Sequence, residues 1–240
     1  MNSLSDNQVS LYEEPVQEKI RKFIKIEFLL NKIYYFKSKD NKSENYVALL
    51  ALCELYEILS RSDIKSELIR EIETQNSYFG KIKEIPQADS SKLNSVLEKQ
   101  NLLLKSIYNI ESNYLDYLEH DILFKTILKN CFTQLQPASI DFWLSRDILI
   151  RETQIDLWLE PLIFIKRSID FILEVIRKAG RFEDRMAEKG FFIEKLDPKR
   201  NILLIRVTLT SDLYYYPQIS VGKQRLTIMF MTKDDKNNLV

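Results

Sequence analysis

The chain has 240 residues, of which 45% are hydrophobic and 29% are charged, so it is long and apolar enough to bury a sizeable core. Its 35 basic and 35 acidic residues give a formal net charge of zero. No overall field therefore attracts the chain to nucleic acid or to anionic lipid, and an electrostatic partner would have to meet a local patch.

The residue inventory argues against the common kinds of enzyme active site. The 4 glycines are scattered, so no glycine-rich loop is available to wrap a phosphate. His120 is the only histidine, which removes histidine triads and two-histidine metal sites, and we expect it to be a surface or cap residue. The carboxylate pairs Glu13-Glu14 and Asp234-Asp235 join sequence neighbours, whose side chains should diverge and face solvent. We expect no catalytic residue, no cofactor and no metal.

Cys53 and Cys131 are the only cysteines, and they lie far apart in segments with helical periodicity. We therefore predict no disulfide framework. The first ten residues are polar and lack the apolar core of a signal peptide, and Arg or Lys interrupts every apolar run before it reaches membrane-spanning length. These features predict a cytoplasmic protein without membrane insertion.

Apolar residues recur at helical spacing through the first half of the chain. We expect Pro15 in the first turn of the first helix, where proline is tolerated, and Ser62 as the cap of the third. Gly80 and Pro86 mark a connection over residues 76–91. The predicted helices span residues 16–36, 43–60, 62–75, 92–117 and 121–131.

The second half of the chain mixes helix and strand patterns. Residues 139–144 carry apolar residues at every second position, which predicts a strand. A long helix is expected over residues 153–178, with Pro161 either kinking it or lying close to its start, and Gly180 ending it.

After Gly190 the pattern becomes that of antiparallel strands joined in hairpins. The first hairpin pairs residues 191–196 with 202–209, and the second pairs residues 218–221 with 225–231 around Gly222-Lys223. The tail after Thr232 is charged and should fray.

This order of elements predicts an α+β fold, a long antiparallel helical domain with a small antiparallel sheet, because no strand–helix alternation is present to build a parallel sheet. The expected domains are a helical domain over residues 15–135 completed by the helix 153–180, a strand domain over 138–146 and 188–233, and flexible termini at 1–10 and 234–240.

Two stretches at opposite ends of the chain resemble one protein family. Tyr12-Glu13-Glu14-Pro15 with Glu18-Lys19, followed by Ile26-Glu27-Phe28-Leu29, resembles the opening of the ZapD (Z-ring-associated protein D) family. Tyr216-Pro217-Gln218-Ile219-Ser220, followed by Lys223 and Arg225, is similar to that family's hairpin with its spaced basic residues. Between them, Phe142-Trp143-Leu144 and the helix from Gln154 through Trp158 to Ile176 also resemble family segments, so the likeness spans almost the whole chain.

The sequence departs from the family pattern at two positions of the second hairpin. Family members often carry a second basic residue four positions after the one matching Arg225, where this chain has Met229. The hairpin glycine is shifted by one, to Gly222. The positive surface and the loop geometry could therefore differ from those of the family.

The resemblance implies a homodimer whose basic pockets hold the C-terminal peptide of FtsZ, the tubulin-like GTPase of the bacterial Z-ring. Such a dimer crosslinks and bundles FtsZ filaments at the mid-cell division site during septation, without catalysing a reaction. A homodimer is also expected because such a crosslinker needs two sites, and no internal repeat supplies both within one chain.

Six cations match basic positions of the family and form the predicted partner-binding set: Arg21, Lys25, Arg61, Lys65, Lys223 and Arg225. Arg21, Lys25 and Lys32 share one face of the first helix, where six cations meet only two acids between residues 18 and 37. The simpler interpretation is a solvated helix face, and for Arg61 and Lys65 an ordinary helix end.

Other functions remain as alternatives. The runner-up is a generic helical adaptor for another acidic or amphipathic tail. A nucleic-acid-binding module, using Tyr214-Tyr215-Tyr216 as a platform for bases, comes third because the chain lacks a basic excess, and those tyrosines are expected instead to pack the hairpin onto the helices. An enzyme comes last.

Overall fold

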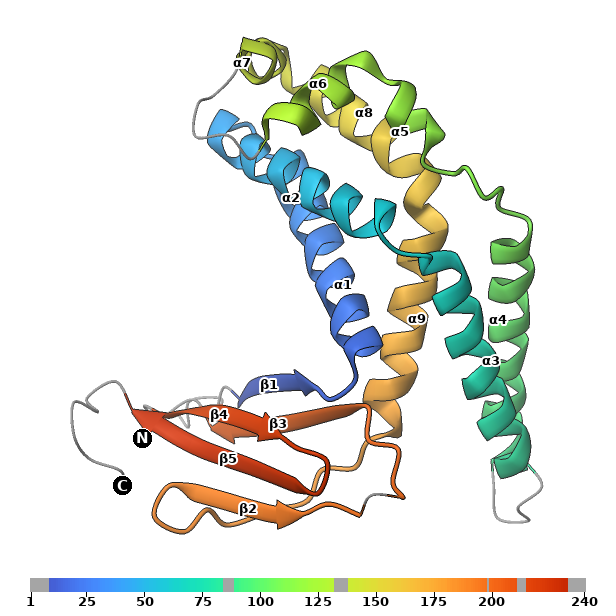
Figure 1. Cartoon of the computed structure of the whole chain (residues 1–240), viewed down its shortest axis with the longest axis vertical. Coiled ribbons are helices and arrows are strands. Elements are labelled where there is room, and N and C mark those ends of the chain that lie inside the picture. Colours follow the sequence, from blue (N-terminus) through green and yellow to red (C-terminus); the bar gives the residue numbers. More distant parts are fainter. Residues whose placement is uncertain (1–8, 84–88, 132–137, 198, 211–214, 233–240) are drawn as a thin grey trace, which may run out of the picture. The chain divides into compact units, whose positions relative to one another are not determined.

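The structure is a computed structural model that describes residues 9–83, 89–131, 138–197, 199–210 and 215–232 (Figure 1). The chain divides into two compact units: a strand unit of residues 1–22 and 175–240, and a helical unit of residues 23–174. The α+β class is confirmed, since long helices build one unit and antiparallel strands dominate the other. The predicted flexible ends are residues 1–10 and 234–240, and they lie outside the described residues except for residues 9 and 10, which belong to a strand.

The described helices are α1 (Glu18–Lys37), α2 (Lys42–Ser60), α3 (Ile64–Lys83), α4 (Ser90–Tyr108), α5 (Asp116–His120), α6 (Ile122–Asn130), α7 (Ala138–Ser145), α8 (Ile148–Leu159), the 3-10 turn η1 (Glu160–Leu162) and α9 (Ile163–Ala179). The strands are β1 (Val9–Pro15), β2 (Phe191–Lys195), β3 (Leu204–Thr210), β4 (Tyr215–Val221) and β5 (Arg225–Thr232).

An aromatic cluster lies in the core of the helical unit. Trp158 of α8 packs against Trp143 of α7, with ring centroids 6.3 Å apart, and against Phe124 of α6 at 5.3 Å. The indole Nε1 of Trp158 donates to Asp121 Oδ2 at 2.9 Å, and Asp121 Oδ1 accepts from the Phe124 N–H at 2.8 Å. Asp121 thus caps α6 and anchors α8 to it.

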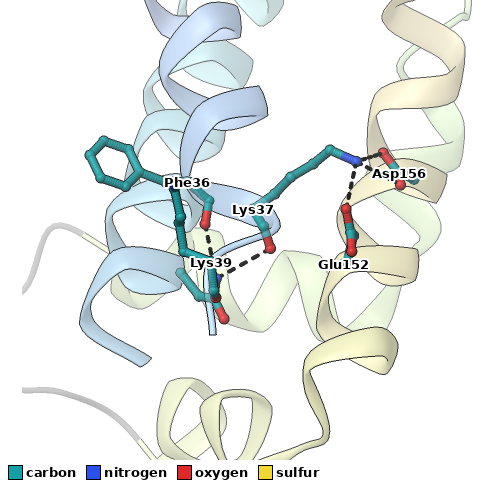
Figure 2. Close-up of polar contacts among 6 residues, drawn as sticks. Phe36, Lys37, Lys39, Glu152 and Asp156 are labelled. Atoms are coloured by element: carbon teal, nitrogen blue, oxygen red, sulfur yellow. Dashed lines mark hydrogen bonds and ion pairs between the residues drawn. The ribbon is translucent and has the colours of Figure 1, made fainter. Parts of the chain in front are cut away.

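Polar contacts hold the end of α1 against α2 and α8 (Figure 2). The buried Asn45 of α2 donates its Nδ2 hydrogens toward the carbonyls of Phe36, Lys37 and Lys39, at 3.0, 3.2 and 2.9 Å. Lys37 Nζ lies 2.6 Å from Asp156 Oδ1 of α8. Because a helix end leaves carbonyls without intrahelical partners, Asn45 supplies donors that α1 lacks.

The predicted strand at residues 139–144 is wrong, because this segment is the helix α7 within the helical unit. Its buried residues are Ile140, Trp143 and Leu144, whereas Phe142 is 55% exposed. Spacings of three and four residues place one helical face in the core, and in so short a segment this pattern is easily mistaken for alternation.

The boundaries of α3 and α4 also differ from the prediction. The helix predicted over residues 92–117 ends at Tyr108, and a separate short helix, α5, begins at Asp116. The cap of α3 is Asp63 rather than Ser62, since Asp63 Oδ1 accepts from the Ser66 N–H at 3.2 Å. Hydrogen bonds from the Ser66 side chain and then from its N–H lower the pKa of Asp63. The helix then continues through Gly80 to Lys83, so much of the predicted connection is helical.

Proline divides the predicted helix at residues 153–178. The chain already enters α8 at Ile148, where Asp147 caps the helix, and Pro161 lies in the 3-10 turn that separates α8 from α9. The missing N–H of proline removes a helical hydrogen bond, which explains the interruption. Helix α9 ends at Ala179, immediately before Gly180 as expected.

The prediction of no disulfide is wrong, because Cys53 and Cys131 are bonded to each other. Cys53 lies in the middle of α2, and Cys131 follows the last residue of α6. Both side chains are buried. The bond closes a long loop within the helical unit, since its cysteines are 78 residues apart in sequence.

In the strand unit, β1 pairs antiparallel with β3, and neither this strand nor its pairing was predicted. Pro15 is the last residue of β1 and not part of the first helical turn. The expectation that Glu13 faces solvent is also wrong, because its carboxylate binds the Arg177 guanidinium, with Oε2 2.7 Å from Nη2. Glu14 on the next position points instead to Arg21.

The second sheet has the strand order β2-β5-β4 (Figure 1). The predicted hairpin of β4 with β5 is confirmed. The predicted hairpin of β2 with β3 is wrong, because β2 pairs with β5 and β3 pairs with β1. A cavity of about 410 Å³ lies in this unit, lined by β3, by Leu226 and Ile228 of β5, and by the segment 180–187.

Candidate functional site

The predicted partner-binding cations divide between the two units. Arg21, Lys223 and Arg225 belong to the strand unit, and Lys25, Arg61 and Lys65 belong to the helical unit. The convergence of Arg21, Lys25 and Arg61 with Lys223 and Arg225 on one basic groove stays a prediction.

Arg21 lies at the start of α1, where acidic residues already surround it. Its guanidinium donates to Glu14 Oε1 at 3.1 Å, to Glu18 Oε2 at 3.0 Å and to the Pro15 carbonyl at 3.0 Å. The side chain is still 52% exposed. Arg21 therefore connects β1 to α1, and a partner carboxylate would have to compete with two from its own chain.

Lys223 and Arg225 lie at the tight turn between β4 and β5. The Gly222 N–H donates to the Arg225 carbonyl at 2.8 Å, which leaves Lys223 and Gln224 as the two loop residues. Both cationic side chains are exposed. Within the part of the chain that the structure describes, neither forms an ion pair, so both are available to an anionic partner.

Lys195 is a further cation at this turn that the sequence prediction missed. It is exposed and lies directly opposite Arg225 in the β2–β5 ladder. The predicted pairing of β2 with β3 placed Lys195 away from the second hairpin. Only the β2–β5 pairing brings Lys195, Lys223 and Arg225 to the same end of one sheet.

The helical-unit cations differ in how tightly their own chain holds them. Lys25 Nζ lies 2.7 Å from Glu54 Oε1, and Arg61 Nη2 lies 3.5 Å from Glu57 Oε1. Arg61 is 76% exposed and caps the end of α2. Lys65 donates to the Ile110 carbonyl, and so fastens α3 to the end of α4. Arg61 is therefore the most accessible of the three.

An exposed face of α1 alternates cations with aromatic rings. Lys25 and Lys32 lie 5.7 and 5.8 Å from the ring centroid of Phe28, and Lys39 lies 4.5 Å from that of Tyr35. Phe28 is 56% and Tyr35 60% exposed. We call these five residues the α1 stripe. Their spacing of three or four residues keeps Lys25, Phe28, Lys32 and Tyr35 on one side of α1, and Lys39, just after the end of the helix, lies over the Tyr35 ring. These residues can contact both charged and apolar groups.

Lys37 does not belong to this stripe, although it contributes to the basic excess of α1. Burial lowers its pKa, but hydrogen bonds and charges from Asp156 and then Glu152 outweigh that effect and raise the pKa above its ordinary 10.5. Figure 2 shows Lys37 reaching toward both carboxylates. The Lys37 ammonium therefore holds α1 against α8 through its ion pairs with Glu152 and Asp156.

Other chemistry is weakly represented. His120 ends α5, and its Nδ1 lies 2.7 Å from the Asp116 carbonyl, as expected of a helix-end residue. Among the described residues, no three His, Cys, Asp or Glu side chains gather where they could hold a metal ion. Searched over the same residues, no helix is long and apolar enough to cross a membrane.

Comparison with known proteins decides the family. The family model ZapD, described as a cell division protein, matches residues 24–229 and so covers parts of both units. The chain belongs to the ZapD family. It is 27% identical over 225 residues to the Cell division protein ZapD of Azoarcus sp. (strain BH72), with 92% of this chain and 89% of the relative covered.

Other ZapD relatives give the same result. The protein of Methylococcus capsulatus is 28% identical, with 94% of this chain and 90% of the relative covered. That of Pectobacterium carotovorum is 29% identical, with 95% and 91% covered. Membership of the ZapD family gives the protein a role in cell division.

Proposed function

We propose that this ZapD-family protein binds the C-terminal peptide of FtsZ and, as a homodimer, crosslinks and bundles FtsZ filaments to stabilise the Z-ring. It would act in the cytoplasm at the mid-cell division site. The observation that supports this proposal most strongly is the family match over residues 24–229. A crosslinker needs binding sites and not a reaction centre, so no cofactor enters the proposal.

The proposed tail site draws on the six predicted cations. Among the described residues, Lys223 and Arg225 have no ion-pair partner, whereas Arg21 and Lys25 share their charges with Glu14 and Glu54. Exposed pairs contribute only about 0.2–1 kcal/mol each and are screened by salt. Several cations must therefore act together, and apolar contacts such as those offered by the α1 stripe would add affinity.

Filament bundling follows from the number of binding sites in the dimer. Two equivalent sites in a dimer can hold tails from two filaments, and each weak contact raises the effective concentration for the next. Light scattering during size-exclusion chromatography should give twice the 28.5 kDa chain mass. A monomer at micromolar concentration would contradict the dimer.

The tail site is tested by the anisotropy of a fluorescent peptide that carries the FtsZ C-terminal residues. The triple variant Arg21→Glu, Lys25→Glu and Arg225→Glu should bind at least about tenfold more weakly, and raised salt should weaken the wild type. The matched control is Lys125→Glu on the exposed side of α6. Circular dichroism and the dimer mass must be unchanged in each variant.

Two results would reject this assignment. Unchanged affinity in the folded, dimeric triple variant would place the site elsewhere. Equal affinity for an unrelated acidic peptide of the same length would favour a generic adaptor for acidic tails.

A further inference from the structure

The sheet β2-β5-β4 has two faces of different character. Because strand side chains alternate, the buried Leu226 and Ile228 point to the cavity side, together with Phe230, which also lines the cavity. Arg225, Thr227 and Met229 of β5 therefore point to the opposite side, which we call the outer face. Their cross-strand partners on β2 and β4 share this face.

Two cations oppose each other at one end of the outer face. Lys195 of β2 is in register with Arg225 of β5. The hydrogen bonds from Leu196 N–H to the Gln224 carbonyl at 2.8 Å, and from Phe230 N–H to the Gly190 carbonyl at 2.9 Å, fix the alternation of the ladder. Lys195 and Arg225 consequently form a non-hydrogen-bonded pair, the kind in which opposed side chains come closest.

This arrangement costs stability unless an anion relieves it. Like charges directly opposite in an antiparallel pair are destabilising. Among the described residues, the outer face carries no carboxylate, since Glu194 of β2 points to the other side and lines the cavity. Lys223 in the adjoining turn adds a third positive charge. The end of the sheet is thus complementary to carboxylates from outside the chain.

The rest of the outer face is open and carries an apolar strip beside the uncharged polar residues Thr227, Gln218 and Ser220. Ile193, opposite Thr227, is 60% exposed, and Tyr216, opposite Met231, is 50% exposed. Phe191 and Met229, which face each other between them, are partly exposed. An apolar strip that ends in a cluster of cations fits an extended peptide with apolar side chains and a carboxylate-bearing end.

We propose that the outer face docks an acidic peptide lengthwise, with its carboxylates on Lys195 and Arg225 and its apolar side chains on Ile193, Met229 and Tyr216. The inference rests on the proposed function, because the occupant is the FtsZ C-terminal peptide. It adds Lys195 and the apolar strip to the site. A second copy of this face is a poorer occupant, since it brings more cations and no carboxylate, and burying unpaired charges is costly.

The decisive variant is Lys195→Glu, which turns the repulsive pair into an attractive one. Its Tm should rise by about 1–3 °C, while peptide affinity should fall at least about threefold. A merely structural role for Lys195 would move only the Tm. Lys125→Glu, the same charge change on the helical unit, should leave the affinity unchanged.

Methionine methyl NMR locates the peptide directly. The chain has only 4 methionines, so a ¹³C-methyl-labelled protein gives a simple spectrum. Titration with the FtsZ C-terminal peptide should shift Met229 and Met231 and leave Met186, which is 84% exposed on the segment after α9, in place. Shifts that follow protein concentration without peptide would mark the face as an interface between copies and overturn the proposal.

Two kinds of failure can be told apart. If the wild type binds the peptide, but Lys195→Glu binds equally well or the signals of Met229 and Met231 stay still, only the docking face is wrong. If the wild type does not bind the peptide at all, the proposed function fails, and the docking face fails with it.

Discussion

Glu13 of β1 and Arg177 of α9 form a two-point ion pair, with Arg177 Nε donating to Oε1 at 2.9 Å and Nη2 to Oε2 at 2.7 Å. Both side chains are largely shielded, with 17% and 26% exposed. The guanidinium of Arg206 also approaches this carboxylate, its Nε 3.2 Å from Oε1. Glu13 therefore joins three elements of the strand unit.

We predict that Glu13→Gln lowers the free energy of unfolding by about 1–3 kcal/mol, because two shielded guanidinium groups lose their carboxylate. The matched control is Glu14→Gln, whose side chain is 35% exposed and pairs with the open Arg21, and whose loss should cost under about 1 kcal/mol. Urea unfolding measures both. Equal losses of unfolding free energy in the two variants would show that the Glu13–Arg177 ion pair stabilises the protein no more than the more exposed Glu14–Arg21 pair does.

The disulfide between Cys53 and Cys131 should stabilise the helical unit. Their separation of 78 residues means that the bond removes much conformational entropy from the unfolded chain. The oxidised protein should be about 2–4 kcal/mol more stable than the protein in excess phosphine reductant, with thiol titration confirming each state. Cys131→Ala should abolish this dependence on reductant. Identical unfolding curves for oxidised and reduced wild type would contradict the prediction.

Asn45 should be irreplaceable by aspartate despite the equal size. Asn45→Asp removes the Nδ2 donors that α1 needs for its terminal carbonyls and brings a negative charge to the negative end of the helix dipole. We expect a loss of about 2–4 kcal/mol, larger than that of Asn45→Ala. Thermal unfolding of the two variants side by side makes the comparison. If Asn45→Asp destabilises the protein less than Asn45→Ala does, hydrogen-bond donation by the Asn45 side chain is not the main stabilising contribution at this position.

Alkaline pH should destabilise the helical unit through Tyr56. Burial first, and then its hydrogen bond to Glu119, raise the pKa of Tyr56 from 10.0 to about 12. Unfolded tyrosine ionises near pH 10 while the folded one stays protonated, so this stabilisation is complete below pH 10 and is lost as the pH rises toward 12. The Tm of Tyr56→Phe should fall less steeply over this interval. Parallel Tm curves for wild type and variant would contradict the assignment.

Local periodicity predicted most helices, because long helices such as α1 and α2, with 20 and 19 residues, repeat apolar residues at helical spacing over several turns. It failed at α7, where eight residues fit both a strand and a helix. It also failed for contacts between distant segments. The β1–β3 and β2–β5 pairings and the Cys53–Cys131 bond depend on tertiary arrangement, which no local pattern contains.

The same limit applies to the candidate site. Lys223 and Arg225 share one turn, so sequence proximity was enough to place them together. Lys195 joins them only through the β2–β5 register, and it was therefore missed. Lys65 had the right residue type but donates to the Ile110 carbonyl, a contact that sequence spacing could not predict.

The most direct test of the proposed function is co-sedimentation with FtsZ polymers assembled in GTP. The protein should pellet with full-length FtsZ and convert single filaments into bundles, and both effects should disappear with FtsZ that lacks its C-terminal peptide. Equal co-sedimentation with the truncated and the full-length polymers would contradict binding through the FtsZ tail.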